Sequence, residues 1–471
     1  MPDQQPGFDA ITEREKGLHR GLSTGQLSMI AIGGAIGTGL FLGSGFAIGL
    51  AGPAVLVSYA IGALIALLLM GCLAEMTVAH PISGSFGAWA EFYISPLAGF
   101  LVRYAYWAGI MLAVGTEVTA IAVYMGFWFP HVPGLAWITG FGGVLVLVNA
   151  FNVKFFGSVE YGFSAIKISA IVIFIALGSW VILASPSGAS IAFQNYFAHG
   201  GFFPHGLWGM WTAVLLALFS YSGIEMIAIA AGEARDPQIA ITRALKATVF
   251  RLVLFYLCTL AVILAIVPWT STASTTNQSP FVKVMTATHL PYAAGIINFV
   301  ILVAALSAMN SLLYCTTRMM FSLSRAGHAP RRCGRLTSRG VPLAALLLSA
   351  SGIAVAALLT ALFRNAFIII LGLSLFGVMF AWLMIFVTHF YFRRRHAAET
   401  LPFRMWGFPY TTIVGTALMA AAITTTLFTQ QFRMTIICGI PFLLALTAVF
   451  LIRNRRAPAP DQPLAEESLT T

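Results

Sequence analysis

Long apolar runs, separated by short polar loops, are the feature of this 471-residue sequence that most restricts its fold. A helix needs about 20 mostly apolar residues to cross the hydrocarbon core of a bilayer. Twelve such runs lie at residues 27–50, 54–79, 98–128, 135–152, 161–184, 207–231, 246–268, 292–316, 341–363, 366–391, 410–429 and 434–452. Only 9% of the residues are charged, whereas a soluble domain carries about 25%. The sequence therefore predicts an all-α polytopic membrane protein with twelve transmembrane helices.

The basic residues gather in the loops on one side of the predicted membrane. An even number of spans puts both termini on one side, and nineteen lysines and arginines fall there. The opposite side holds only Lys283, Arg364 and Arg433. Because basic residues accumulate in cytoplasmic loops, both termini are predicted to be cytoplasmic. These short clusters also explain the net charge of +11 without a nucleic acid partner.

The first run contains a glycine-rich stretch at residues 33–45, GGAIGTGLFLGSG. Each glycine weakens a helix by about 1 kcal/mol relative to alanine, and a break in lipid must line a cavity or a tight helix contact. In a cavity, the amides of Thr38 and Gly39 would begin a half-helix that suits a carboxylate. The carbonyls of Ala35 and Ile36 would suit an ammonium group. Close packing of two helices through small residues is the favoured explanation of this stretch when it is taken alone.

The sixth run carries a matching interruption, FSYSGIE at residues 219–225. A break at Ser222 and Gly223 would again free backbone groups, next to the carboxylate of Glu225. If runs one to five and six to ten are two repeats, the interrupted runs occupy equivalent positions in them. Because each repeat then has an odd number of spans, the second must be inverted in the membrane relative to the first. Such pairs indicate the binding site of a transporter. We therefore expect discontinuous helices one and six, and favour a binding site over packing.

The repeats give a division of the chain. Residues 1–26 and 453–471 are predicted to be cytoplasmic tails, of which 1–20 and the part after Arg456 are expected to be disordered. Residues 27–184 and 207–391 form the two repeats, and 410–452 hold two further helices. Residues 81–96 fit a short interfacial helix or an ordinary loop equally well.

Three ionisable residues lie within apolar runs, namely Glu117, Lys167 and Glu225. Each costs at least about 2.5–3.5 kcal/mol at the bilayer centre, so such residues usually face a cavity or a partner. Glu225 is either a protonatable carboxylate coupled to substrate or a hydrogen-bonding brace, and Glu117 either contacts substrate or shapes the pocket wall. Lys167 titrates, stands in for a cation, or reaches the headgroups. Arg103 and Glu75 lie nearer the ends and are expected to reach the membrane surface.

Several stretches resemble the amino acid permeases of the APC superfamily, most closely the bacterial branch that carries aromatic amino acids, lysine, GABA, alanine and glycine. They include IAIGGAIGTGLFLGSG (30–45), YWAGIMLAVGTEVTA (106–120), FNVKFFGSVEYGFSAIKI (151–168) and FSYSGIEMIAIAAGEARDP (219–237). The resemblance implies a fold of the LeuT type, in which two inverted five-helix repeats are followed by two C-terminal helices and helices one and six are discontinuous.

The resemblance also implies a substrate site. Its residues here are Ala35, Ile36, Gly37, Thr38, Gly39, Glu117, Phe219, Ser222 and Gly223. Glycines and Thr38 of the first break would bind the carboxylate, carbonyls of both breaks the amino group, and Phe219 would act as a gate. In proton-coupled relatives a lysine at the position of Lys167 replaces a sodium ion, so Lys167 and Glu225 are the expected proton-coupling residues.

The sequence thus predicts a secondary active transporter that imports amino acids with protons across the inner membrane by alternating access. An exchanger of the same fold is the alternative, and a transporter-like sensor is a further one. No Asp lies within any run, which argues against an intramembrane enzyme. No cofactor, metal or obligate protein partner is expected, and a neutral substrate is favoured over a cationic one.

Overall fold

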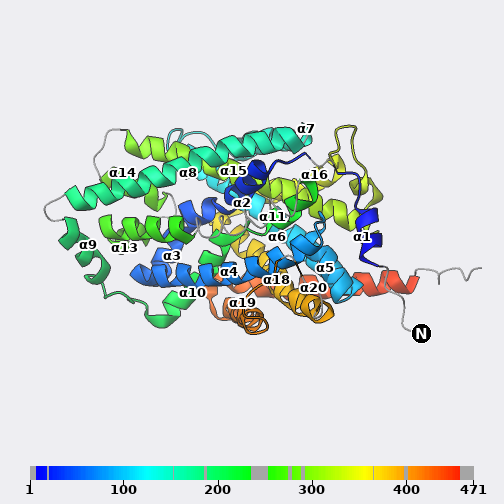
Figure 1. Cartoon of the computed structure of the whole chain (residues 1–471). Coiled ribbons are helices and arrows are strands. Elements are labelled where there is room, and N and C mark those ends of the chain that lie inside the picture. The colour runs from blue at the N-terminus through cyan, green and yellow to red at the C-terminus, as the bar shows by residue number, and fades with distance from the viewer. Residues whose placement is uncertain are drawn as a thin grey trace, which may run out of the picture.

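The computed structural model describes residues 7–18, 21–151, 153–184, 188–234, 253–273, 278–287, 292–363, 365–396, 401 and 403–456. Regular structure in these residues is helical, apart from one isolated bridge between Leu22 and Ala234. Figure 1 shows the long helices packed side by side, with α1 (Phe8–Arg14) and the last turns of α20 (Arg433–Arg456) at one end of the bundle. The two ends of the described chain therefore lie on one side.

The helices follow the apolar runs in order. The first half contains α2 (Thr24–Ala35), a π-helical segment (Gly39–Gly43), α3 (Ser44–Ala51), α4 (Val55–Ala79), α5 (Ser85–Tyr93), α6 (Pro96–Gly126), α7 (Gly134–Phe151), α8 (Val153–Ala184) and α9 (Gly188–Phe197). The second half contains α10 (Gly206–Tyr221), α11 (Met226–Ala230), α13 (Trp269–Ala273), α14 (Pro280–Ala287), α15 (Ala293–Arg325), α16 (Leu343–Ser349), α17 (Ser351–Leu362), α18 (Ala366–Arg395) and α19 (Tyr410–Phe428), followed by α20.

Ten segments of the described residues are long and apolar enough to cross a membrane. They are Gly25–Ala79, Pro96–Gly126, Gly134–Phe151, Val153–Ala184, Gly206–Glu233, Ala293–Arg325, Leu343–Leu362, Ala366–Arg395, Tyr410–Phe428 and Gln430–Asn454. The first covers two predicted runs, and a shorter apolar helix, Val253–Ile266, lies in the seventh run, of which residues 246–252 are outside the described residues. The chain is therefore a multi-pass membrane protein.

Helices α8 and α15 extend well beyond the predicted runs and bury polar side chains in the added turns. Helix α8 begins at Val153 rather than at 161, and this brings Glu160 inside the helix, where it is fully buried. Helix α15 continues past 316 to Arg325 and buries Arg318, which pairs with Glu233 at 2.7 Å. A hydropathy criterion ends a span at such residues, whereas the protein continues the helix and provides partners for them.

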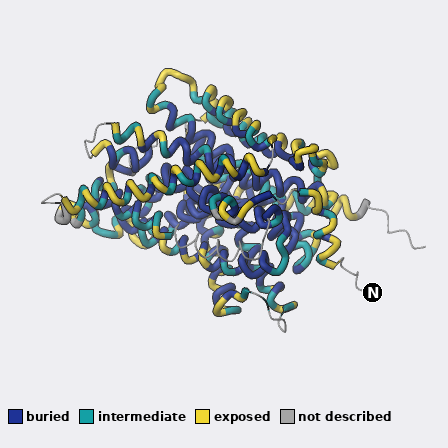
Figure 2. Tube along the Cα trace, turned by 45° about the horizontal axis from the view of Figure 1, so that its top comes forward, coloured by how far each residue is buried: buried dark blue, intermediate teal, exposed yellow. Residues whose placement is uncertain are grey.

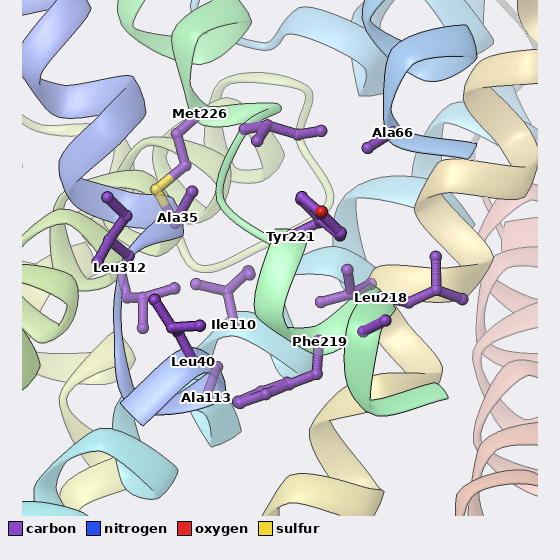
Figure 3. Close-up of a cluster of buried hydrophobic side chains, with 14 of the residues drawn as sticks. Ala35, Leu40, Ala66, Ile110, Ala113, Leu218, Phe219, Tyr221, Met226 and Leu312 are labelled. Carbon is purple, nitrogen blue, oxygen red and sulfur yellow. The ribbon is translucent and has the colours of Figure 1, made fainter. Parts of the chain in front are cut away.

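The interior of the bundle is closely packed around α10 and α6. Figure 2 shows buried residues throughout the centre and exposed residues on the outside, and Figure 3 shows the buried apolar side chains where α2, α6, α10 and α15 meet. Helix α6 packs against both α15 and α18. A Cβ atom at Gly377 of α18 would lie 2.0 Å from the carbonyl oxygen of Ala105, so glycine permits the close approach of α6 and α18.

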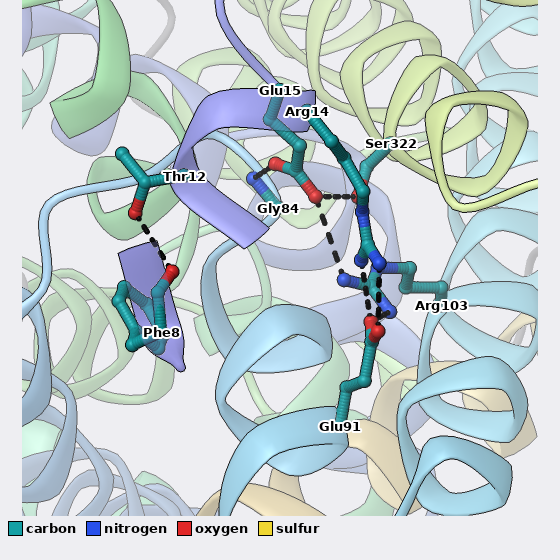
Figure 4. Close-up of polar contacts among 8 residues, drawn as sticks. All are labelled: Phe8, Thr12, Arg14, Glu15, Gly84, Glu91, Arg103 and Ser322. Atoms are coloured by element: carbon teal, nitrogen blue, oxygen red, sulfur yellow. Dashed lines mark hydrogen bonds and ion pairs between the residues drawn. The ribbon is translucent and has the colours of Figure 1, made fainter. Parts of the chain in front are cut away.

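The prediction of a disordered stretch at 1–20 is wrong for the described residues 7–18, which include α1. Arg14 donates two hydrogen bonds to Glu91 of α5, at 2.8 and 2.6 Å. Glu15 accepts hydrogen bonds from the amide of Gly84 at 2.8 Å and from the hydroxyl of Ser322 at 2.6 Å. Figure 4 shows how this network ties the N-terminal segment to α5 and to the end of α15. The open alternative for residues 81–96 is resolved as a helix, α5, and the predicted disorder after Arg456 lies outside the described residues.

Arg103 and Glu75 do not reach the surface as expected, because both are buried and paired. Arg103 donates to Glu91 at 2.7 Å and to the hydroxyl of Ser322 at 2.9 Å. Glu75 forms an ion pair with Arg393 at 2.8 Å, and its carboxylate lies 3.0 Å from Nε2 of His389, within hydrogen-bond distance. A buried charge persists only when a partner and hydrogen bonds compensate its desolvation, and the sequence did not reveal these distant partners.

Candidate functional site

The first interruption lies directly after α2. Helix α2 ends at Ala35, Ile36 leaves the helical conformation with φ −85° and ψ 89°, and the π-helical segment begins at Gly39. A Cβ atom at Gly37 would lie 2.6 Å from Oε1 of Glu117, so only glycine lets that carboxylate come so close to the chain. The backbone at residues 36–38 therefore packs directly against the Glu117 side chain of α6.

The second interruption follows α10. Helix α10 ends at Tyr221, Ser222 is extended, and Gly223 has a φ of +104°, which residues with a side chain rarely adopt. A Cβ atom at Gly223 would lie 2.6 Å from the carbonyl carbon and oxygen of Gly34, and one at Gly39 would lie 2.7 Å from Cα of Ser220. The two interruptions thus contact each other, backbone against backbone, at two points.

Glu117 binds the start of the helical segment after the first interruption. The amide nitrogen of Thr38 lies 3.2 and 3.3 Å from the two carboxylate oxygens of Glu117, and the Thr38 hydroxyl donates to Oε1 at 3.0 Å. Both residues are buried, with Glu117 only 4% exposed. The structure therefore places a carboxylate on the amide for which the sequence predicted a substrate carboxylate.

The carbonyl groups at the two interruptions share one hydroxyl. Tyr256, in the helix Val253–Ile266, has its hydroxyl oxygen 2.7 Å from the carbonyl oxygen of Ala35 and 2.8 Å from that of Ser220. Tyr256 was not among the predicted site residues. An aromatic residue with a polar tip inside an apolar run was its only signal, and a buried tyrosine hydroxyl generally has a hydrogen-bond partner.

Phe219 and Ser222 lie at the end of α10. The Ser222 hydroxyl donates to the carbonyl oxygen of Phe219 at 2.7 Å, so it bonds to the helix end from which it projects. Phe219 is 5% exposed and belongs to the buried apolar cluster that also contains Leu40 and Ala113. Figure 3 shows its ring on the side of Leu40 and Ala113. These side chains give the contact between α6 and the two interruptions an apolar wall.

Lys167 is fully buried and bonds to the end of α2. Its ammonium group donates to the carbonyl oxygens of Gly33 and, at 3.0 Å, of Ile36. The interpretation in which this lysine reaches the headgroups is therefore wrong, because the side chain extends to another helix instead. A cation at this point is favoured by the carbonyl groups that a helix leaves unpaired at its C-terminus.

Glu160 lies on the same helix as Lys167 and was not among the predicted site residues. It lies just outside the fifth apolar run, 161–184, and so did not appear among the ionisable residues within runs. The carboxylate accepts hydrogen bonds from Asn310 at 3.1 Å and from Ser307, and the hydroxyl oxygen of Ser164 lies 3.2 Å from Oε1. The signal that could have found it was the acid two helical turns before Lys167, on one face of a helix.

Glu225 lies within the second interruption. Its carboxylate accepts a hydrogen bond from the amide of Gly223 at 3.0 Å and another from the hydroxyl of Tyr106 at 2.9 Å. The side chain is fully buried. In this geometry Glu225 connects the second interruption to α6, as Glu117 connects the first.

Nearly the whole chain matches a known family. A family model described as amino acid permease matches residues 26–460. The amino acid permease YtnA of Bacillus subtilis (strain 168), itself uncharacterized, is 38% identical over 446 residues, which cover 93% of this chain and 96% of the relative. The aromatic amino acid transport protein AroP of Salmonella typhimurium (strain LT2) is 35% identical over 443 residues, with the same shares. Like these relatives, the chain belongs to the amino acid permease family.

Proposed function

We propose that this protein imports amino acids together with protons across the inner membrane by alternating access. Family membership indicates a transporter rather than an enzyme. The observation that carries the mechanism is the contact between the two interruptions, where the backbone of residues 34–39 meets that of residues 220–223 in the buried interior. Interrupted helices that meet at mid-membrane provide the binding site in many secondary transporters.

The proposed architecture has twelve spans. If Gly25–Ala79 is two crossings and Val253–Ile266 belongs to one more, the ten candidate segments become twelve. Residues 27–184 and 207–391 are then the inverted repeats, 410–452 the added helices, and 1–26 and 453–471 cytoplasmic tails. The position of both described chain ends on one side of the bundle supports this proposal.

The substrate binds as a zwitterion between the two interruptions. Its carboxylate accepts hydrogen bonds from the amide and hydroxyl of Thr38, which donate to Glu117 in this structure. Its ammonium group donates to the carbonyl oxygens of Ala35 and Ser220, which share the hydroxyl of Tyr256 in this structure. Two side chains of the protein thus occupy the positions of the two charged ends of an amino acid, and the substrate replaces them.

This replacement supplies a reason for proton coupling. Two ionised carboxylates repel each other at one amide, so a substrate carboxylate at Thr38 binds more readily when Glu117 carries a proton. Lys167 and Glu225 remain the coupling residues implied by the family resemblance. Lys167 holds the end of α2 in place, and Glu225 holds Gly223.

A neutral amino acid with an apolar side chain is the proposed substrate class. The apolar wall formed by Leu40, Ala113 and Phe219 offers no charged partner for a substrate side chain. One relative is named as an aromatic amino acid transport protein, which agrees with this class.

The test is uptake of labelled amino acids into proteoliposomes that contain the full chain, with and without an inward proton gradient. We expect at least one neutral amino acid to accumulate only with the gradient. Uptake that requires an amino acid inside the vesicles, whatever the gradient, would identify an exchanger instead. The proposal is refuted if no amino acid is taken up or exchanged by folded protein.

A further inference from the structure

A carboxylate and an ammonium group lie on one face of α8 at the point where this helix meets α2. Glu160 and Lys167 are two helical turns apart, and neither side chain is exposed. A Cβ atom at Gly33 would lie 2.0 Å from Oε1 of Glu160, and Lys167 donates to the carbonyl group of the same glycine. Both side chains therefore contact α2 at Gly33, just before the first interruption.

The carboxylate of Glu160 is held mainly by α15. Ser307 and Asn310 are neighbours on that helix and both donate to Glu160. The orientation of the Asn310 amide is set in turn, since its oxygen accepts a hydrogen bond from Asn149 of α7 at 2.8 Å. With the nitrogen of Asn310 pointing at Glu160, Oε2 of the carboxylate accepts at that contact, while Oε1 faces the hydroxyls of Ser307 and Ser164.

Ser164 connects this carboxylate to α2. Its hydroxyl lies 3.2 Å from Oε1 of Glu160 and donates to the carbonyl oxygen of Met29 at 3.0 Å. The contact between α8 and α2 therefore contains an acid, a hydroxyl and an ammonium group, each with polar partners of its own. Such a group of side chains inside a membrane is stable only if every member is satisfied.

The charged groups around Lys167 are few. Two carboxylates lie beside the groups that bind it. Glu160 packs against Gly33, whose carbonyl group Lys167 binds, and Glu117 binds the amide of Thr38, two residues after the carbonyl group of Ile36. Helices α2, α7 and α9 carry no charged residue, and on α15 the charge of Arg318 is compensated by Glu233. Because Glu117 is bonded to Thr38, Glu160 is the carboxylate that stays with Lys167 when the first interruption takes up substrate.

We propose that Glu160 is a positioning residue for proton coupling, whose carboxylate is the fixed counter-charge that keeps Lys167 protonated and bound to the end of α2. This inference rests on the proposed function. While α2 packs on α8, the ammonium group has two carbonyl acceptors and one counter-charge. When α2 moves away, the carbonyl groups of Gly33 and Ile36 leave with it, whereas Glu160 keeps its donors on α15. The proton then leaves the nitrogen of Lys167 for water.

Glu160→Gln tests this role because glutamine keeps the size of the side chain and removes its charge. Without the counter-charge, protonation of Lys167 needs a higher proton concentration. We expect the external pH of half-maximal uptake to fall by about one to two units, measured in proteoliposomes with the amino acid that the wild type takes up fastest. Gly162→Ala, on the same helix, is the control, since it keeps every charge and a Cβ atom there meets nothing within 4 Å, so its pH profile should match that of the wild type.

A charge exchange keeps the inference testable if Glu160→Gln does not fold. In the double variant with Glu160→Gln and Asn310→Asp, the carboxylate moves to the neighbouring position, which lies 3.1 Å from the original one. We expect this variant to regain the pH profile of the wild type to within about half a unit.

The outcomes separate this inference from the proposed function. If the wild type takes up amino acids with protons and folded Glu160→Gln has an unchanged pH profile, the counter-charge role is wrong and the proposed function stands. The role is also wrong if the double variant folds and keeps an acid-shifted profile. Absence of proton-driven uptake by the wild type overturns both.

Discussion

The carboxylate of Glu117 lies on the backbone amide of Thr38, with the amide nitrogen 3.2 Å from one oxygen and 3.3 Å from the other. A carboxylate at the start of a helical segment is the arrangement that a substrate carboxylate would adopt. The protein thus satisfies its own anion site with an acid from α6. Substrate binding and the protonation of Glu117 are linked if both carboxylates use this amide.

Replacing Glu117 with glutamine should separate substrate binding from the proton gradient. The side-chain oxygen of glutamine still accepts from Thr38, but it carries no charge to repel a substrate carboxylate. We expect accumulation driven by a proton gradient to fall at least about tenfold, while exchange across the membrane stays within about threefold. Both are measured with labelled amino acid in proteoliposomes. Undiminished accumulation by Glu117→Gln would show that this acid does not couple substrate binding to the proton gradient.

Tyr256→Phe should destabilise the substrate-free protein. The change leaves two buried carbonyl groups, those of Ala35 and Ser220, without their shared donor, at a cost of about 1–3 kcal/mol. Bound substrate would supply a new partner for these carbonyl groups. It should therefore raise the thermal unfolding temperature of Tyr256→Phe more than that of the wild type. Tyr221→Phe is the matched control. Its ring lies 4.8 Å from that of Tyr256, and its hydroxyl has no hydrogen-bond partner among the residues that the structure describes.

If the two variants lose equal stability, the hydroxyl of Tyr256 does not hold the interruptions together. A second outcome is that only Tyr256→Phe loses stability, but substrate raises its unfolding temperature no more than that of the wild type. In that case the substrate's ammonium group does not bind the carbonyl groups of Ala35 and Ser220 in place of the hydroxyl.

Gly223→Ala should abolish transport. The backbone conformation at φ +104° is strained for alanine, and its Cβ atom would overlap the backbone of Gly34 at 2.6 Å. We expect uptake to fall by more than about tenfold, since the two interruptions cannot keep their contact. Gly162→Ala is the control, because a Cβ atom there meets nothing within 4 Å. Wild-type uptake by folded Gly223→Ala would contradict the contact as the basis of the site.

The attachment of α1 should not depend on pH in the range where transport is measured. Burial raises the pKa of Glu91, but the hydrogen bond from Arg14 and the charges of Arg103 and Arg14 outweigh it and lower the pKa to about 2. A carboxyl group with a lowered pKa stabilises the folded state above its unfolded pKa of about 4.3, and this contribution is lost as the pH falls through about 2. Between about pH 5 and 8 the contact is therefore complete.

Hydrogen exchange checks this prediction. After correction for the intrinsic rates, the amides of residues 8–14 should show the same protection throughout that range in the wild type and lose it in Arg14→Gln. Protection that already decreases between pH 6 and 5 would mean that another group controls the attachment of α1.

The sequence predicted the elements that depend on local composition. Apolar runs located the helices because lipid requires apolar surfaces. Two glycine-containing stretches marked the ends of α2 and α10, because glycine permits unusual backbone conformations. Helix ends were missed at Glu160 and Arg318, which are polar yet buried. Their partners, Asn310 and Glu233, lie far away in the sequence, so only the folded chain shows that these residues are satisfied.

The partners within the site could not be predicted for the same reason. The motifs suggested that Thr38 and Glu117 share a site, but not that one binds the other. Tyr256 carried no motif at all, and its role follows from two carbonyl groups that only tertiary structure brings to one hydroxyl. The N-terminal helix was missed because the residues that hold it, Glu91 and Ser322, belong to other helices.

Simultaneous measurement of amino acid and proton movement tests the central claim most directly. Proteoliposomes with the wild-type chain and an enclosed pH indicator are given a labelled neutral amino acid outside, without any imposed gradient. The account predicts that the interior acidifies as the amino acid enters, and that neither occurs with Gly223→Ala. Entry of the amino acid with no change of internal pH would contradict proton-coupled import.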